Sequence, residues 1–282
     1  MKNLLFLLML SLIVCNQSFS QAFYSDNIQK IWETEAVFKV PESVIYDPTN
    51  DIIYVSNING DPTEEDANGF ISKLGIKGNV VELNWITGLH APKGMGIIAD
   101  TLFVADVNRV VKIDTRLEEI IAIYDAEGAT FLNDITIDDQ GRVFISDSGL
   151  GAIFLLEGDK IDVFLPKGTF ERSNGLFWFN NELYVGTKGK IKSVNLENKR
   201  HRDVIEVDGG IDGLEIWKGQ YFVFSDWSGK VQLADLSGNS RVLFDTTPIS
   251  VNAADIEVIG KSDLLFVPTF FDNRVMAYQI FE

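Results

Sequence analysis

Short apolar runs, separated by turn residues, recur along the chain at a regular spacing. Each run is rich in β-branched and aromatic residues and is bounded by Asp, Asn or Gly, a pattern typical of strands joined by turns. Six stretches repeat the same order of strand, turn and strand: PESVIYDPTNDIIYVSN, PKGMGIIADTLFVADV, LNDITIDDQGRVFISDS, SNGLFWFNNELYVGTK, IDGLEIWKGQYFVFSDW and AADIEVIGKSDLLFVPTF. No stretch keeps a convincing 3.6-residue period over three turns, so the pattern predicts an all-β protein.

The repeat has the length of a propeller blade. Further apolar runs follow each copy, such as GFISKLGI and NVVELNWI after the first, which makes four strands per repeat. Aligned on the residue before the first apolar run, successive copies start 51, 40, 41, 38 and 42 residues apart, and an acidic insertion at residues 60–69 explains the longest interval. This period predicts a six-bladed β-propeller with four antiparallel strands per blade. A β-sandwich with coincidental spacing is the alternative.

The two ends of the chain are expected to close the ring together. The last copy offers only three strands and finishes with NRVMAYQIFE. Its missing outer strand can come from KIWETEAVFK at residues 30–39, which precedes the first blade. Pairing of residues 31–39 with residues 273–281 would protect an otherwise open strand edge.

The first twenty residues have the layout of a secretory signal. Lys2 precedes an apolar run from Leu4 to Val14, and small polar residues follow it. The run is too short and too early for a membrane span. We therefore expect a leader at residues 1–20, a single propeller domain at residues 21–282, and export to the periplasm or the medium. Lipid anchoring through Cys15 is the alternative, which the bulk of Val14 disfavours.

Composition and charge narrow the classes of ligand. The only cysteine lies in the leader, so the exported chain has no thiol for disulfides, catalysis or metal binding, and two histidines argue against a histidine-rich metal centre. The net charge of −17 repels nucleic acid and anionic membrane surfaces. A small neutral or cationic ligand, or a hard cation, suits this chain better. We expect a monomer.

One column of the repeat varies where the rest is constant. The residue before the first apolar run is, copy by copy, Glu42, Lys93, Asn133, Asn174, Asp212 and Ala254. The first strand of a propeller blade lies innermost, so these residues are expected to form a ring at the mouth of the central channel. Polar side chains that converge on one axis are what a ligand site requires.

Three residues of this ring suit a hard cation. Glu42, Asn174 and Asp212 offer three oxygen ligands and two negative charges, which fits calcium best, with magnesium, manganese or zinc as alternatives. The remaining coordination positions could hold water or substrate. The competing interpretation is that each of these residues only caps a turn, as Asn and Asp often do.

At these residues the chain resembles the gluconolactonase, regucalcin and senescence-marker-protein family. The resemblance rests on Glu42 in VPES, Asn133 in FLND, Asn174 in SNGL and Asp212 in IDGL, in the first, third, fourth and fifth copies. It implies a six-bladed propeller in which Glu42, Asn174 and Asp212 hold a divalent metal, Asn133 faces the substrate and Asp212 also helps to activate water. It further implies hydrolysis of a small substrate such as a sugar lactone, for which no G-x-S-x-G nucleophile is needed.

The chain departs from the family at two positions. The family often carries an arginine where this chain has Phe131, and a glycine where it has Ser43. Lys93 adds a cation to the ring. We expect it to bind an anionic or polar group of the substrate in place of the arginine; pairing with Glu42 or Asp212, or a solvated position at a loop edge, are the alternatives.

A second functional class stays open. VADVNRVVKID and FDNRVMAYQI resemble the units of NHL-type propellers, which are often binding scaffolds, so a non-catalytic ligand-binding or protein-binding propeller is the alternative to a metal-dependent hydrolase. The acidic insertion could be a lid or a second cation site, although a solvated loop is the simpler interpretation. Glu215 and Glu257 could line the channel, and His90 is expected to pack or to lie at the surface.

Overall fold

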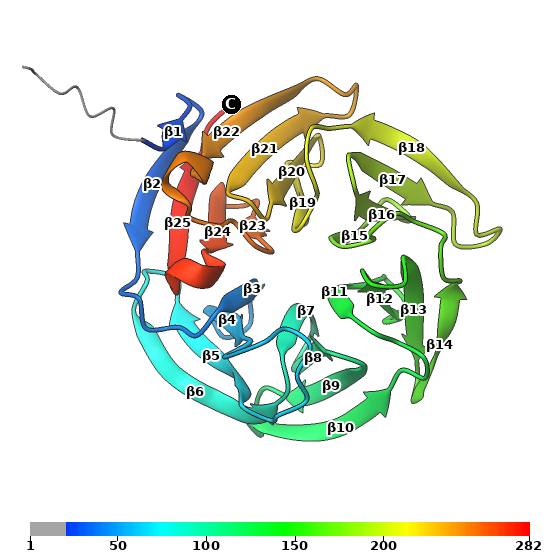
Figure 1. Cartoon of the computed structure of the whole chain (residues 1–282). Coiled ribbons are helices and arrows are strands. Elements are labelled where there is room, and N and C mark those ends of the chain that lie inside the picture. The colour runs from blue at the N-terminus through cyan, green and yellow to red at the C-terminus, as the bar shows by residue number, and fades with distance from the viewer. Residues whose placement is uncertain (1–20) are drawn as a thin grey trace, which may run out of the picture.

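The structure, a computed structural model, describes residues 21–282 and shows six antiparallel sheets arranged as blades around a central axis (Figure 1). The predicted leader, including Cys15, lies outside the described residues. The first three blades consist of β3 (Pro41–Asp47), β4 (Ile52–Asn57), β5 (Gly69–Gly75) and β6 (Val80–Leu89); β7 (Pro92–Ile98), β8 (Thr101–Asp106), β9 (Arg109–Asp114) and β10 (Glu119–Asp125); and β11 (Leu132–Ile137), β12 (Val143–Asp147), β13 (Ala152–Glu157) and β14 (Lys160–Leu165).

The other three blades repeat this plan, with the inner strand first in the sequence. They consist of β15 (Leu176–Phe179), β16 (Glu182–Thr187), β17 (Lys190–Val194) and β18 (His201–Glu206); β19 (Leu214–Trp217), β20 (Tyr221–Asp226), β21 (Lys230–Asp235) and β22 (Ser240–Asp245); and β23 (Glu257–Ile259), β24 (Leu264–Pro268), β25 (Val275–Ile280) and the N-terminal β2 (Ile28–Glu33). The six-bladed propeller predicted from the repeat is therefore confirmed. Two single-turn 3-10 helices, η1 (Thr247–Ile249) and η2 (Phe270–Asp272), lie in loops between strands.

Apolar side chains fill the spaces between neighbouring blades. Each of six buried clusters draws its residues from two adjacent blades, so every blade is stabilised by the blade on either side. Between the third and fourth blades, for example, Phe144 and Phe164 pack with Leu176 and Val185. This arrangement follows from the second strand of each blade, such as β4 and β8, which is rich in apolar residues and buried on both faces.

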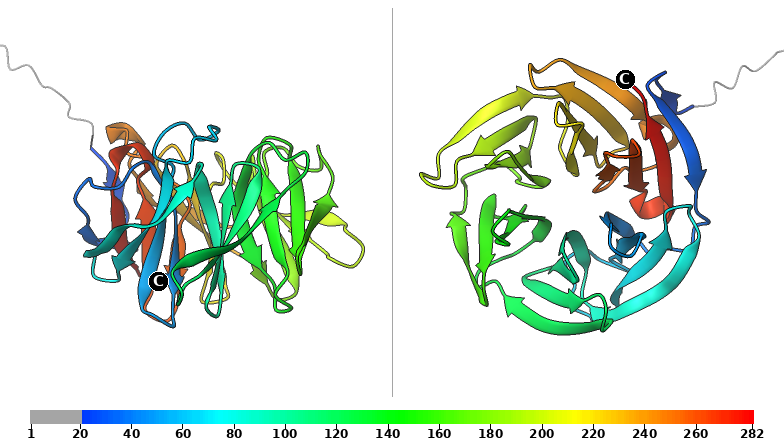
Figure 2. Two further views of the ribbon diagram at one scale, coloured as in Figure 1. Left: turned by 90° about the horizontal axis from the view of Figure 1, so that it is seen from below. Right: turned by 180° about the vertical axis from the view of Figure 1, so that it is seen from behind.

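The N-terminal strand closes the ring, as the sequence predicts. β2 pairs antiparallel with β25, and Ile28 lies opposite Ile280 while Glu33 lies opposite Met276. Figure 2 shows these two strands, blue and red, side by side at the rim of the ring. The paired strand spans residues 28–33 rather than 31–39, because the chain beyond Glu33 turns inward: Phe38 donates its backbone N–H to Asn273 O at 3.3 Å and is buried between the sixth and first blades.

A further short strand, β1 (Phe23–Tyr24), joins the fifth blade. It pairs with β22, so this blade has five strands. The sequence analysis did not predict this strand, since two residues are too few for a recognisable period. Over residues 21–282, no helix has the length and apolar character needed to cross a membrane.

Candidate functional site

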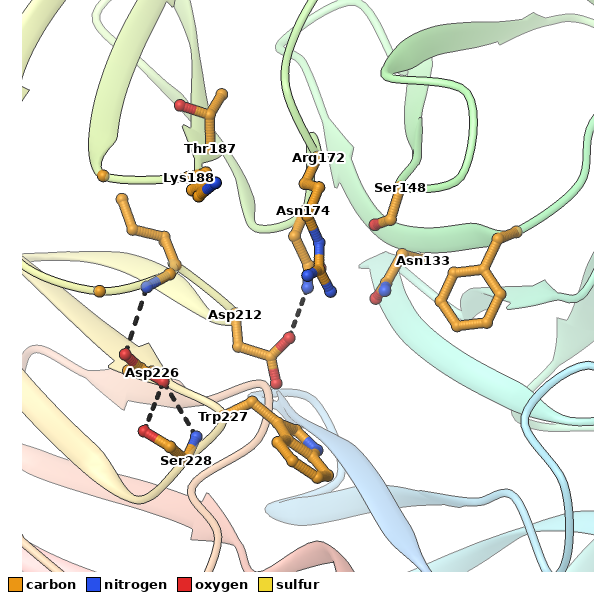
Figure 3. A pocket seen from close by; sticks show the side chains of 15 residues that line it. Asn133, Ser148, Arg172, Asn174, Thr187, Lys188, Asp212, Asp226, Trp227 and Ser228 are labelled. Carbon is orange, nitrogen blue, oxygen red and sulfur yellow. Dashed lines mark hydrogen bonds between the residues drawn. The ribbon is translucent and has the colours of Figure 1, made fainter. Parts of the chain in front are cut away.

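A pocket opens at the mouth of the channel on the side of the third, fourth and fifth blades. It has a volume of about 660 Å³, and Asn133, Asn174 and Asp212 all line it (Figure 3). The structure thus brings three of the predicted ring residues into one cleft. The other lining residues are Phe131, Ser148, Arg172, Thr187, Lys188, Gly189, Gly209, Gly210, Ile211, Asp226, Trp227 and Ser228.

Asn174 and Asp212 are joined by a hydrogen bond between neighbouring blades. The Asn174 Nδ2 donates to Asp212 Oδ1 (Figure 3). Each residue is also fixed by its own blade, because the Asn174 N–H donates to Gly186 O at 2.9 Å and the Asp212 N–H donates to Ser225 O at 2.8 Å. Both side chains are therefore held in place before any ligand binds.

The glycine that follows the ring residue allows the blades to approach this closely. A Cβ on Gly175 would lie 2.6 Å from Asp212 O, and one on Gly213 would lie 2.4 Å from Ile256 N. Both contacts are with backbone atoms, which cannot yield as a flexible side chain would. At these two positions the glycine is thus required by the packing of the blades, whereas the residue before it is free to carry chemistry.

Two carboxylate oxygens in this region are buried without hydrogen-bond partners. Among the described residues, Glu42 Oε2 and Asp212 Oδ2 have no partner, and the two side chains are only 4% and 7% exposed. Burial raises the pKa of Asp212 to about 7, with the Asn174 hydrogen bond opposing this and the charge of Asp226 adding to it. Burial also raises the pKa of Glu42 well above its ordinary value, and the charge of Asp212 raises it further.

These orphaned oxygens fit a bound cation. An unpaired buried carboxylate is costly unless a positive group satisfies it, and carboxylate oxygens are the ligands that hard divalent cations prefer. No group of three or more His, Cys, Asp and Glu side chains within residues 21–282 is spaced to hold a metal. The predicted set contains only two carboxylates, and its third member, Asn174, is an amide.

Lys93 is buried next to the pocket rather than in it. Its side chain is 1% exposed, its Nζ donates to Ala91 O at 2.9 Å, and the Nζ lies 4.6 Å from the centre of the Phe131 ring. Burial lowers the pKa of Lys93 to about 8, although the charge of Glu42 opposes this shift. Lys93 offers a ligand almost no surface, so its position favours the alternative role of a counter-charge for Glu42.

An apolar cluster covers the other half of the mouth. Ile58, Val107 and Phe270 pack there with Ala91 and Ala254. The first three follow the second strand of the first, second and sixth blades, β4, β8 and β24, directly or after one residue. The pocket is therefore confined to three blades, and Glu42 and Lys93 belong to the two inner strands, β3 and β7, on the covered side.

The residues that the sequence analysis missed occupy the same column in the three open blades. Ser148, Lys188 and Trp227 directly follow β12, β16 and β20, and all three line the pocket. At this position the first two blades carry an apolar residue, whereas the three open blades carry a polar or aromatic one. A comparison of the six copies could have found this difference. Arg172, by contrast, precedes the repeat in a loop and leaves no comparable signal.

A second, smaller cavity of about 360 Å³ runs along the inner strands. Asp134, Glu215, Asp255 and Glu257 line it, which confirms that Glu215 and Glu257 face the channel. Burial raises the pKa of Asp134 to about 7 and that of Glu257 to about 8. The pKa of Glu215 is also raised, first by burial and then by the charge of Glu257.

The acidic insertion forms an exposed loop with a fixed base. The Ala67 N–H donates to His90 Nδ1 at 3.2 Å, and the Asn108 side chain donates to Glu65 at 3.0 Å. His90 thus anchors the loop, and Asp61, Glu64 and Glu65 are exposed. This geometry favours a solvated loop over a second cation site.

The fold and the site thus define a six-bladed propeller with a polar channel mouth that is open on one half. Comparisons with solved structures agree on this fold. No protein-family model matches the chain, and no curated protein matches it. The fold is similar to that of a candidate gluconolactonase, with a TM-score of 0.66, 14% identity, and coverage of 91% of this chain and 93% of that one.

Two other solved structures share the fold. One is a catalytically inactive virginiamycin B lyase from Staphylococcus aureus with quinupristin, with a TM-score of 0.61, 13% identity, and coverage of 92% and 100%. The other is a chain of a nidogen–laminin complex, with a TM-score of 0.60, 14% identity, and coverage of 74% and 86%. Identities this low establish the propeller alone, because propellers carry many functions.

Proposed function

We propose that the protein is a metal-dependent hydrolase that opens a lactone or a related ester at the mouth of the propeller. The observation that carries this proposal is the pair of buried, unpaired oxygens, Glu42 Oε2 and Asp212 Oδ2, beside a pocket of about 660 Å³. The candidate gluconolactonase with the same fold supports the choice of reaction.

Glu42, Asn174 and Asp212 would hold one divalent cation, most simply calcium. When bound, such a cation would polarise the substrate carbonyl and lower the pKa of the attacking water. The protein itself supplies a proton acceptor and a donor. Asp212, whose buried Oδ2 has no hydrogen-bond partner among the described residues, offers a carboxylate oxygen that can accept a proton from water. Asn133, 6% exposed and facing the same pocket, can donate a hydrogen bond to a substrate oxygen.

A binding propeller without catalysis is the second candidate function. The observation that favours it is the buried Lys93, whose charge acts on Glu42 where a cation is proposed to bind. If Lys93 already balances Glu42, the pocket would bind a ligand without metal chemistry. Metal binding therefore separates the two functions.

Calcium is expected to raise the melting temperature of the purified protein. At a concentration about 100 times the dissociation constant, binding to the folded state alone adds about 2.7 kcal/mol, or about 5–10 °C for a chain of this size. Glu42→Gln and Asp212→Asn should each abolish most of this gain, because each removes one of two ligand charges. Differential scanning fluorimetry with EDTA and with calcium measures the effect.

Glu64→Gln is the matched control. It removes one carboxylate from the exposed insertion, where no side-chain hydrogen bond of Glu64 is described, and it should keep the full calcium response. Equal stabilisation of the wild type, Glu42→Gln and Asp212→Asn would place the cation elsewhere. A panel of lactones assayed with and without EDTA then tests turnover, and a calcium-binding protein that opens none of them would favour the binding propeller.

A further inference from the structure

Arg172 is a free cation in the pocket. Its side chain is exposed, it lines the cleft with Asn133, Asn174 and Asp212, and Figure 3 shows it pointing into the pocket. Among the described residues, no hydrogen-bond acceptor and no carboxylate within 4.0 Å pairs with its guanidinium. The guanidinium N–H groups of Arg172 are therefore available to a ligand.

The other cation of the pocket is already paired. Lys188 Nζ lies 3.0 Å from Glu171 Oε1, and this pair is largely exposed to solvent. Lys93, as described above, is buried behind Phe131. Arg172 is thus the one pocket-lining cation within residues 21–282 that forms no ion pair within 4.0 Å, although its charge acts on Asp212 and opposes the rise of the Asp212 pKa.

The backbone that carries Arg172 is held in a costly conformation. Arg172 has a φ of +55°, a left-handed value that an arginine adopts only when its surroundings impose it. The neighbouring Ser173 is fully buried; its hydroxyl donates to Asp147 O at 3.1 Å, and its own carbonyl accepts a 2.6 Å bond from Ser148 Oγ. On the other side, the Lys188 N–H donates to Glu171 O at 3.2 Å. The loop is fixed on both sides, so Arg172 enters the pocket from a rigid base.

A guanidinium in this position matches a carboxylate. The planar group binds carboxylates through two parallel hydrogen bonds, which add geometric specificity as well as energy. Arg172 is a single cation beside Asp212 and Asp226, so it can balance the one negative charge of a carboxylate. A phosphate with two charges would be repelled by the acidic surroundings.

We propose that Arg172 binds a carboxylate of the substrate, so that the preferred substrate is a lactone or ester that carries a second, ionised acid group. The lactone or ester group in this inference rests on the proposed function. The contact between Arg172 and a carboxylate does not, because a binding experiment alone can test it. In the resembling family, an arginine at the position of Phe131 would position the substrate. Here Arg172, which comes from the following blade, takes that role.

Two lactones that differ only in this group provide the kinetic test. D-glucaro-1,4-lactone carries a free carboxylate where D-glucono-1,4-lactone carries a hydroxymethyl group. The wild type should prefer the first in kcat/KM, and Arg172→Gln should lower kcat/KM for it by about 10- to 100-fold, mainly through KM, since a hydrogen-bonded ion pair has this strength. The value for D-glucono-1,4-lactone should change less than about threefold.

Lys188→Gln is the matched control, because it removes the paired cation of the same pocket. It should shift the ratio of the two kcat/KM values by less than about threefold. Arg172→Lys, which keeps the charge but loses the planar fork, should recover only part of the preference. Equal losses on both lactones in Arg172→Gln, or no preference in the wild type, would overturn the proposal.

A binding experiment keeps the proposal testable if neither lactone is opened. Calorimetric titration with D-gluconate and with D-glucitol, both in EDTA, compares one carboxylate with none in the absence of metal. The wild type should bind D-gluconate at least about tenfold more tightly, and Arg172→Gln should remove this difference. An unchanged D-gluconate affinity, or no preference over D-glucitol, refutes the carboxylate contact. A clear preference without turnover would refute the hydrolase and leave the contact standing.

Discussion

At the scale of single residues, the mouth of the channel separates scaffold from chemistry. Gly175 and Gly213 repeat because a side chain there would collide with the next blade. Asn174 and Asp212, one position earlier, bear no such constraint and form a hydrogen bond across the two blades. We therefore expect substitutions at this column to alter the site without altering the fold.

Lys93 allows a sharp test of the electrostatics of the site. Lys93→Met keeps the apolar stem against Phe131 but removes a buried charge that acts on Glu42. We expect calcium affinity to rise by about tenfold or more, because a unit charge at about 10 Å and an effective dielectric constant near 20 contributes well over 1 kcal/mol. Calorimetric titration with calcium measures this.

The matched control for Lys93 is Lys188→Met, which removes an exposed lysine whose charge Glu171 already balances. It should leave calcium affinity nearly unchanged. Weaker calcium binding in Lys93→Met would contradict the repulsion argument. A wild type that binds no calcium, together with a Lys93→Met variant that does, would show that Lys93 occupies the place of the metal and would favour the binding propeller.

The sequence was a good guide to which residues share the mouth and a poor guide to which are accessible. The period of the repeat placed Asn133, Asn174 and Asp212 together, because equivalent positions of a propeller meet at one axis. It did not show that Lys93 is covered, since that depends on Ile58, Val107 and Phe270 packing over one half of the mouth. Arg172 could not be predicted at all, because its direction is set by a loop conformation.

At the scale of elements, ring closure depends on one N-terminal strand. β2 supplies the outer strand of the sixth blade, Ile28 packs in the core between the fifth and sixth blades, and Trp32 donates its Nε1–H to Ile76 O at 3.1 Å in the first blade. The strand thus links three blades. The sequence predicted its existence from a missing strand in the last copy, but not its bounds, which the inward turn after Glu33 sets.

Deleting residues 21–33 should destabilise the whole ring. The edge of β25 would lose its partner and become free to pair with other chains, so we expect a lower melting temperature and aggregation. Deletion of residues 21–25 is the control: it removes only β1, a two-residue strand that is exposed, and should have a much smaller effect. The measurements are thermal unfolding and light scattering. A full deletion that unfolded like the wild type would show that closure does not need β2.

At the scale of the whole molecule, a net charge of −17 is combined with a channel lined by buried carboxyl groups. Asp134, Glu215, Asp255 and Glu257 face one cavity, and the pKa of each is raised, with burial as the largest cause. Propeller geometry makes such a concentration unavoidable once several inner strands carry acidic residues, because all inner strands face the same axis. The stability of the protein should therefore depend on pH.

The sign of this dependence follows from Glu257. Its pKa is raised to about 8 in the folded protein, above the ordinary value of 4.5, so the folded state holds a proton that the unfolded state has lost across this interval. The stability that this proton contributes is present below the ordinary value and is lost as the pH rises toward 8. Between pH 6 and pH 8 the loss amounts to roughly 2 kcal/mol for one such group.

Glu257→Gln should flatten the pH dependence and stabilise the protein at pH 8. The effect should exceed that of one group, because the charge of Glu257 also raises the pKa of Glu215, and the two titrate together. Urea unfolding at pH 6, 7 and 8 in EDTA measures the free energy of unfolding without any contribution from bound metal. Glu127→Gln, at an exposed position in the loop after β10, is the control and should follow the wild type. If Glu257→Gln lost stability with pH as steeply as the wild type, these channel carboxyl groups would have to be ionised and solvated in the folded protein at neutral pH.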